Sequence, residues 1–459
     1  MTSWDRLSAS ALRKLQDRLV AHQVQHVVGP FSPYWKARLA ELGRRASSIG
    51  SATALETLPA AGERDVAPDG SPAGMARLVV QASEGGFVLH AKGPTMRRAL
   101  RLRLTARDAY AKAVAHETKP TSYTWSGLGF RYPIASTRAD LDAVARAGAR
   151  LWSIAGLSAH DALLSAVPVA STAEHIALSY AALAAGAPAL FPGPEPAALV
   201  AAAKLATPTV IAAPSKTAAE VLGVLTDAGV ALDHVRTVLL VGAPTAEQRA
   251  AVVGRVPGAT VLAVHAPSGA RVLWAECRSG GAPAGFHTYP DLDLVQLVDP
   301  ETGEPAAGGG EIVLSQLGLF GSALLRWRTG DLTSAPVEIT KCPGCGRRVP
   351  RVVGLRAAAL VLVSDDGRTL DLRTVAGALS GRTDLSDWRL AVGSRNRDGR
   401  GQVVVHLVPD GDPGEVAVAA ATDIRSVAGL LPTQLVVASA DDLAALPGEP
   451  LSPRILLRG

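Results

Sequence analysis

The most informative part of this sequence runs Leu325-Arg326-Trp327-Arg328-Thr329-Gly330-Asp331-Leu332-Thr333. It joins an apolar segment to a glycine and a carboxylate, so the apolar part predicts a strand and the glycine predicts a turn after it. Antiparallel strands are expected at 292–299, 310–317 and 323–328, with a turn at 299–303. Asp331 would then follow a strand, where it either forms the turn or offers an ionised acceptor to a ligand.

Upstream of this region, short apolar runs alternate with helical patterns. Strands are expected at 162–169, 188–191, 209–213, 237–241 and 260–264, with helices at 173–185, 216–228 and 246–253. Strands that alternate with helices imply parallel pairing and an α/β domain. The predicted fold is α/β, with a large N-terminal domain at 1–353 that includes the antiparallel strands, and a small α+β C-terminal domain at 354–459.

The segments nearest the N-terminus show weaker patterns. Residues 4–50 are expected to be helical, and 50–75, rich in Gly, Pro and Ala, to form a loop. A further helix is expected over 139–156, started by Ser136 and Thr137.

Composition narrows the class of protein. Of 459 residues, 48% are hydrophobic and 19% charged, which is typical of a globular chain with more than one domain. The net charge of +5 is mild, and the densest basic run, 97–103, is predicted to be a solvated helix face, with phosphate or partner binding as the alternative. No aromatic residues interleave with it, so no nucleic-acid partner is expected.

Neither a leader nor a membrane segment is predicted. Residues 1–19 carry charges and lack an apolar core, and the longest apolar stretch, 176–191, is shorter than a span requires. We therefore expect a soluble, cytoplasmic protein without a membrane partner.

A metal site is suggested by Cys277, His287, Cys342 and Cys345, which include every cysteine of the chain. The CxxC spacing of Cys342 and Cys345 can place two thiolates on one ion from a tight turn. Three thiolates and one imidazole form the closed tetrahedral set of a structural zinc site. The alternative is buried or free thiols beside an ordinary histidine.

The order of these features resembles the phenylacetate–CoA ligase family of adenylate-forming enzymes, over nearly the whole chain. Residues 325–333 are similar to that family's ribose-binding motif. Cys342-Pro343-Gly344-Cys345-Gly346-Arg347, followed by Pro350-Arg351-Val352, is similar to the segment that leads to its interdomain hinge. Weaker matches are 15–19 and 30–35 to the family's opening segments, and 136–141 to the stretch after its phosphate loop.

This resemblance implies an ATP-dependent ligase that activates a small carboxylic acid. The family forms an acyl-adenylate with ATP and Mg²⁺, then passes the acyl group to the thiol of CoA. Its small C-terminal domain is mobile and turns between the two steps. Further partners that the resemblance allows are a carrier protein and a second copy of the chain.

The resemblance also implies site residues. Asp331 matches the carboxylate that accepts hydrogen bonds from the ribose hydroxyls. The remaining cofactor-binding candidates are Gly242 and Ala243 against the adenine, Ser126, Gly127 and Gly129 in the phosphate loop, and Arg351. The catalytic candidates are Arg131, in place of the loop lysine, His265, in place of an aromatic residue, and Arg454, near the place of the C-terminal lysine.

This sequence differs from the family's pattern in three places, and these differences weaken the prediction of an ATP-dependent ligase. The loop lacks paired threonines, no carboxylate for Mg²⁺ occurs within 264–270, and Lys341 is the last lysine of the chain. Loss of one preorganised group commonly costs roughly a hundredfold or more in rate. Two functions therefore stay open: a ligase, or a lapsed homologue that binds an acyl group, CoA or a carrier protein without adenylation.

Overall fold

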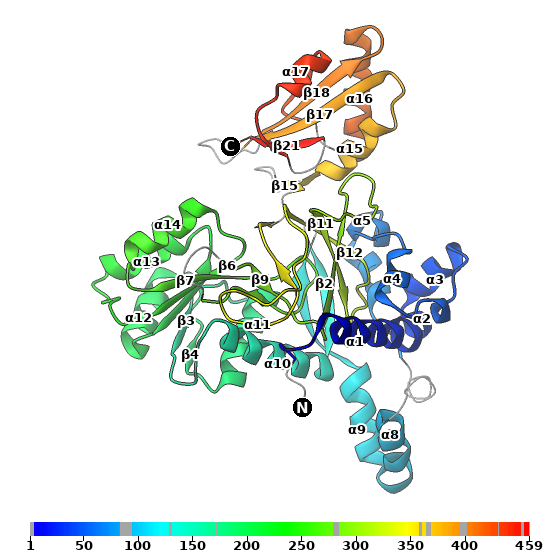
Figure 1. Ribbon diagram of the computed structural model, residues 1–459. Helices are drawn as coiled ribbons and strands as arrows, with labels where there is room; N and C mark the ends of the chain where they lie inside the picture. The colour runs from blue at the N-terminus through cyan, green and yellow to red at the C-terminus, as the bar shows by residue number, and fades with distance from the viewer. Residues whose placement is uncertain are drawn as a thin grey trace.

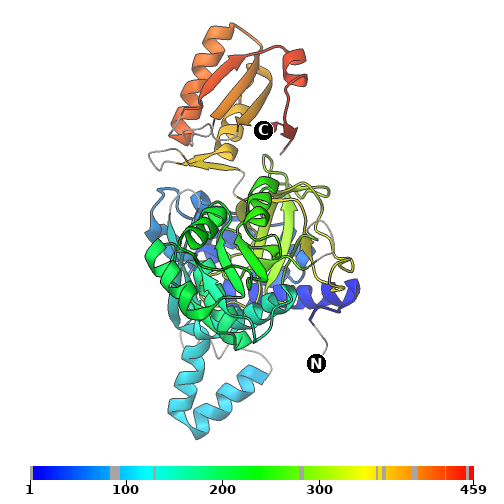
Figure 2. The ribbon, with the colours of Figure 1, turned by 90° about the vertical axis from the view of Figure 1, so that its left-hand side faces the viewer.

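The computed structural model describes residues 4–82, 94–127, 131–170, 172–278, 284–357, 360–363, 369–393, 402–429, 431–450 and 454–458. Figure 1 shows a large body, a smaller part above it that carries the C-terminus, and a pair of helices that extends below it. The view in Figure 2 shows the same order along the vertical axis. The extending pair is α8 (Pro94–Thr105) and α9 (Arg107–Thr118). The basic run lies on α8, where Arg97, Arg101 and Arg103 are exposed.

The body is built on an eight-stranded sheet in the order β13-β9-β8-β7-β6-β5-β3-β4. The strands are β3 (Leu163–Ser165), β4 (Ala189–Leu190), β5 (Val210–Pro214), β6 (Thr237–Val241), β7 (Thr260–His265), β8 (Trp274–Ala275), β9 (Phe286–His287) and β13 (Arg351–Val352). From β4 to β7 the pairing is parallel, and from β7 to β13 it is antiparallel. Strands β5 and β6 are buried almost throughout, because helices cover both faces of the sheet.

The helices of this α/β unit are α10 (Arg138–Ile154), α11 (Ala173–Ala185), α12 (Pro196–Ala206), α13 (Ala218–Asp227) and α14 (Ala246–Arg255). Helix α10 begins at Thr137, whose hydroxyl accepts from the N–H of Asp140 while that carboxylate accepts from the N–H of Thr137. The same carboxylate accepts from the N–H groups of Phe320 and Gly321 and pairs with Arg271. The helix start is thereby tied to a loop almost two hundred residues away in sequence.

A second sheet is antiparallel, in the order β10-β11-β12-β14. Its strands are β10 (Asp293–Val298), β11 (Gly310–Gln316), β12 (Trp327–Thr333) and β14 (Leu355–Arg356). The strand predicted at 323–328 is wrong in position, because the glycine and carboxylate expected to follow it lie within β12. An irregular register allows Gly330 to stay inside the strand.

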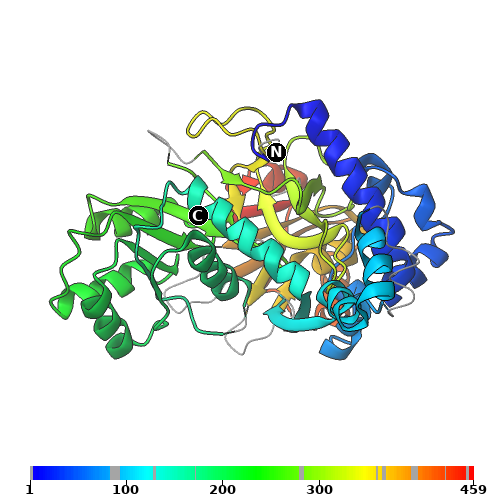
Figure 3. The same cartoon turned by 90° about the horizontal axis from the view of Figure 1, so that it is seen from below.

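The N-terminal region is helical, as predicted. It contains α1 (Ala9–His22), η1 (Gln23–Val28), α2 (Gly29–Phe31), α3 (Pro33–Glu41) and η2 (Ala46–Ser48). The loop predicted at 50–75 is wrong in part, since it holds α4 (Ala52–Glu56), α5 (Glu63–Val66) and α6 (Pro72–Met75), before η3 (Ala76–Leu78). The hydroxyls of Ser51 and Ser71 cap α4 and α6. Seen from below in Figure 3, these blue helices lie at the end of the body opposite the green helices α12 to α14.

A short hairpin, β1 (Pro120–Ser126) and β2 (Tyr132–Thr137), connects α9 to α10. The smaller part has a five-stranded sheet in the order β19-β18-β17-β21-β20 and a β15–β16 pair. Its elements are β15 (Val361–Val363), β16 (Thr369–Asp371), α15 (Leu372–Ser380), β17 (Leu385–Gly393), β18 (Gln402–Pro409), α16 (Pro413–Ala428), β19 (Gln434–Val437), α17 (Ala440–Ala444), β20 (Glu449–Pro450) and β21 (Ile455–Arg458). The predicted fold class is confirmed. In the described part of the chain, no helix has the length and apolar character that a membrane crossing requires.

Candidate functional site

Asp331 lies in β12 at an irregularity of the strand. Residues 329–331 stand opposite Ile312 alone. The regular pairs on either side are Val313–Arg328 and Glu311–Leu332. Gly330 takes φ 74°, a conformation that favours glycine, and the hydroxyl of Thr329 donates to the Ile312 carbonyl at 2.8 Å. This bulge fixes the direction of the Asp331 side chain.

The Asp331 carboxylate contacts His265, the last residue of β7. Nε2 of His265 lies 2.7 Å from Oδ2 of Asp331, and the two side chains are only 8% and 3% exposed. An ionised carboxylate only accepts hydrogen bonds, so the imidazole donates. The structure therefore brings together two predicted site residues, His265 and Asp331, from different sheets. A ligand hydroxyl that binds Oδ2 of Asp331 would have to displace the imidazole N–H or share the oxygen with it.

Gly242 lies at the same edge of the parallel sheet, directly after β6. Its N–H donates to the Val264 carbonyl at 2.8 Å, and its φ is 120°. A Cβ at this position would lie 3.0 Å from Oγ of Ser215, and this φ is strained for any other residue, so the position favours glycine. Ala243 follows and is half-buried. Ligands of open α/β sheets bind at this edge, at the carboxyl ends of the strands.

The stretch expected to form a phosphate loop is described in part. Ser126 ends β1, and its Oγ accepts a hydrogen bond from the N–H of Gly269 at 2.8 Å. Gly127 follows it, Gly129 lies outside the described residues, and Arg131 is exposed beside β2. Ser126 thus joins this stretch to the loop after His265.

Tyr132 was not anticipated from the sequence. It is buried against the Trp327 ring, with a centroid distance of 6.1 Å, and its hydroxyl faces Ser126 and Ser268. Burial raises the pKa of Tyr132 well above its usual value. A neutral phenol is a hydrogen-bond donor, so it adds a donor beside the two serines.

Glu276, the carboxylate nearest the expected Mg²⁺ position in sequence, is fully engaged elsewhere. One oxygen lies 2.7 Å from Nη2 of Arg249, and the other accepts from the N–H of Ala263 at 2.7 Å. The side chain is 3% exposed. Glu276 therefore serves as a structural carboxylate between α14 and β7.

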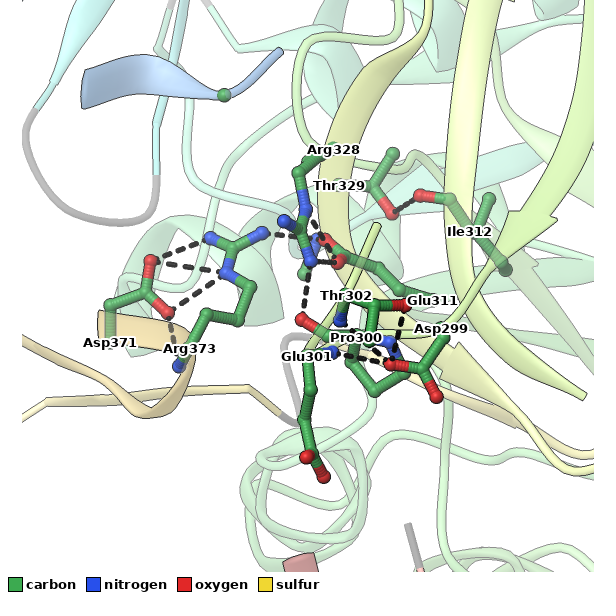
Figure 4. A network of polar contacts seen from close by, with 12 residues as sticks. Asp299, Pro300, Glu301, Thr302, Glu311, Ile312, Arg328, Thr329, Asp371 and Arg373 are labelled. Atoms are coloured by element: carbon green, nitrogen blue, oxygen red, sulfur yellow. Dashed lines mark hydrogen bonds and ion pairs between the residues drawn. The ribbon is translucent and has the colours of Figure 1, made fainter. Parts of the chain in front are cut away.

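Glu311 of β11 forms a second unanticipated network, drawn in Figure 4. Oε2 accepts from Nε and Nη2 of Arg328, at 2.8 and 2.5 Å. Oε1 accepts from the N–H of Gly330 at 3.1 Å and from Nη1 of Arg373 at 2.5 Å. Arg373 in turn pairs with Asp371 at 2.7 Å. Burial lowers the pKa of Arg373, but the Glu311 and Asp371 carboxylates outweigh it, so the pKa is raised.

The cysteines and His287 meet at one point, as the sequence predicted. One ligand atom of each lies within 4.8 Å of the others. Sγ of Cys277 is 3.6 Å from Sγ of Cys342, and Sγ of Cys345 is 3.3 Å from Nε2 of His287. Ligands at zinc bond lengths in a tetrahedron would be about 3.5–3.8 Å apart. The donor set fits a four-coordinate Zn²⁺.

The surroundings of this cluster fix the imidazole. Nδ1 of His287 lies 3.1 Å from the Ala275 carbonyl, which leaves Nε2 to face the thiols. Arg351 belongs to this neighbourhood, because β13 pairs with β9. Its guanidinium donates to the Ala284 carbonyl at 2.7 Å and pairs with Glu338 at 2.5 Å. Arg351 was expected to bind a cofactor, and the contacts found for it connect segments near the Cys and His cluster.

Arg454 lies in the smaller part, just before β21. Its guanidinium covers the Trp388 ring at 4.9 Å and is 3.7 Å from Asp387. Its side chain is 37% exposed. Arg454 is thus held by its own part of the molecule and is not among the residues gathered around Asp331.

No family model and no curated protein matches this chain. Among solved structures, 2-hydroxyisobutyryl-CoA ligase with 2-HIB-AMP and CoA in its thioesterification state is similar, with a TM-score of 0.62, 16% identity, and coverage of 99% of this chain and 91% of that chain. An open conformation of that ligase with the same ligands is similar with a TM-score of 0.61 and 16% identity. The match covers 99% of this chain and 93% of that chain. The chain therefore has the adenylate-forming fold, as its motifs predicted.

Proposed function

We propose that this chain is an acyl- or aryl-CoA-ligase-like protein that binds an adenosine nucleotide at Asp331 and activates a carboxylic acid with it. The observation that carries the proposal is the placement of the Asp331 carboxylate. It lies at a bulge of β12 and contacts His265, which ends β7 at the same edge of the parallel sheet as Gly242, the residue after β6. The 2-hydroxyisobutyryl-CoA ligase of the same fold is described with an acyl-AMP and CoA.

In this proposal the chain's own residues have separate tasks. Asp331 accepts hydrogen bonds from ribose hydroxyls, and Gly242 lets the backbone approach the base. The Tyr132 hydroxyl faces Ser126 and Ser268, next to the stretch proposed to bind the phosphate, and Arg131 would supply positive charge. Mg²⁺ would need water or phosphate ligands, because Glu276 is engaged by Arg249 and a backbone N–H.

A second function, binding without adenylation, is favoured by the two missing charges. No carboxylate for Mg²⁺ occurs within 264–270, and no lysine follows Lys341. Arg454, near the expected place of that lysine, is held against Trp388. Arginine is a planar fork and does not replace a compact ammonium at a site of developing charge. Two such losses, each roughly a hundredfold or more, would make adenylation very slow. An acyl-adenylate, an acyl-CoA or a carrier-bound acyl group would then be the ligand.

We also propose that Cys277, His287, Cys342 and Cys345 hold a structural Zn²⁺. All four donors are protein groups, which leaves no position for a substrate. Bound there, the ion would cross-link the ends of β8, β9 and the CxxC turn. Its contribution would be to folding.

The deciding experiment is a calorimetric titration of the purified protein with ATP, with and without Mg²⁺. We expect micromolar binding that is lost in Asp331→Ala and kept in Asp108→Ala, which changes an exposed aspartate of α9. Absence of binding to a folded protein refutes nucleotide use. If ATP binds, pyrophosphate release with a panel of aryl and short-chain acids separates the ligase from the lapsed homologue.

A further inference from the structure

The larger and smaller parts of the molecule share one buried carboxylate. The side chain of Glu311 is 0% exposed and belongs to the antiparallel sheet of the body. Its Oε1 receives Nη1 of Arg373, which projects from the first turn of α15 in the smaller part and is 16% exposed. In Figure 4 this guanidinium bridges Asp371 of its own part and Glu311 of the body. The ion pair is therefore an interdomain contact.

Each member of this pair also has a partner within its own part. Glu311 keeps Arg328 on Oε2 and the N–H of Gly330 on Oε1, and Arg373 keeps a doubly bonded contact with Asp371. Breaking a buried ion pair is strongly unfavourable when it leaves one charge alone. Here, separation of the two parts breaks the ion pair between Arg373 and Glu311 and leaves both charges compensated by their remaining partners. The contact thus favours the state in which the two parts touch, and it can be broken without leaving an unpaired buried charge.

The contact also reaches the proposed nucleotide site. Oε1 of Glu311 accepts from both Arg373 and the N–H of Gly330, the residue before Asp331. The carbonyl of Gly330 accepts in addition from the N–H of Leu360, at the start of the smaller part. The N–H and the carbonyl of Gly330 are therefore both hydrogen-bonded to residues at the boundary between the two parts, Glu311 and Leu360. A change in the position of α15 would therefore alter the hydrogen bonds of the bulge that directs Asp331.

We propose that Arg373 is a positioning residue that holds the smaller part in one orientation over β12 and couples this orientation to Asp331. The coupling to Asp331 rests on the proposed function, whereas the hold on the smaller part does not. A hydrogen bond to a charged group contributes enough to change a two-state ratio by about 10- to 100-fold. Arg373→Ala should therefore increase the population with separated parts by at least about tenfold.

The test is small-angle X-ray scattering of the full chain, with three variants. Arg373→Ala removes the contact, and Arg373→Lys keeps the charge. Arg382→Ala is the matched control, because Arg382 pairs with Asp384 and Asp423 inside the smaller part. We expect a larger radius of gyration for Arg373→Ala alone, partial recovery in Arg373→Lys, and a wild-type profile for the control.

Two results would overturn the proposal: identical scattering of Arg373→Ala and wild type, or an equal change in Arg382→Ala, which would mean general loosening of the smaller part. ATP titration of the same variants tests the coupling, which requires an affinity change in Arg373→Ala that Arg373→Lys partly reverses. If wild type binds no ATP, the proposed function fails and the scattering still decides the interdomain role. If it binds ATP and Arg373→Ala binds equally well, the coupling is refuted.

Discussion

Replacement of His287 by alanine should release the metal and destabilise the body. The side chain is completely buried, faces Cys345 at 3.3 Å through Nε2, and bonds the Ala275 carbonyl through Nδ1. The unpaired carbonyl alone costs about 1–3 kcal/mol, and loss of a closed zinc site adds several more. A total of at least about 4 kcal/mol corresponds to a fall in melting temperature of roughly 5 °C for a body of this size.

The assay is zinc content per chain by mass spectrometry, together with thermal unfolding. We expect one zinc per wild-type chain, clearly less than one in His287→Ala, and an unchanged value in His160→Ala, where the histidine is exposed. Retention of a full zinc equivalent by His287→Ala would refute the ligand assignment. A metal-free wild type that melts no lower than a zinc-loaded sample would refute the structural role.

Two further predictions concern buried carboxylates. Burial raises the pKa of Asp293 to about 7 from 3.8, so the folded state keeps a proton that the unfolded state loses. Wild-type stability should therefore fall by up to ~4 kcal/mol as the pH rises from about 4 to about 7, and Asp293→Asn should flatten this loss in urea unfolding. Asp140→Ala leaves Arg271, which is 1% exposed, without its carboxylate. It should lower the unfolding free energy by about 3–5 kcal/mol, against less than about 1 kcal/mol for Asp142→Ala, which changes a half-exposed neighbour; equal urea midpoints for the two variants would contradict this.

The parallel sheet could be predicted from the sequence because each of its elements has a strong local pattern. The strand at 237–241 and the helix at 173–185 have the predicted bounds. Elements stabilised by single caps or by distant contacts were missed. Helix α4, with five residues, depends on the hydroxyl of Ser51 and on contacts with α1, which no local periodicity reveals.

In the candidate site, too, residues with a local sequence pattern could be predicted, and contacts between distant segments could not. Cys277, His287, Cys342 and Cys345 were predicted to lie together because CxxC spacing and ligand type carry that information. The contact of His265 with Asp331 could not be foreseen, because it depends on how two sheets pack and on the bulge in β12. Glu311 had a usable signal, since it is the only charged residue of the strand Gly310–Gln316, whereas nothing in the sequence singled out Arg373.

The bulge in β12 also determines how the molecule tolerates insertions and deletions. Side chains of a strand alternate between its two faces, so removal of Thr329 or Gly330 would turn Asp331 toward the opposite side. The core on either side would keep its pairing, since Arg328 and Leu332 are anchored by their partners in β11. A single-codon deletion would thus remove the ribose contact proposed for Asp331 and leave the architecture in place, which is a short evolutionary route from a ligase to a binding protein.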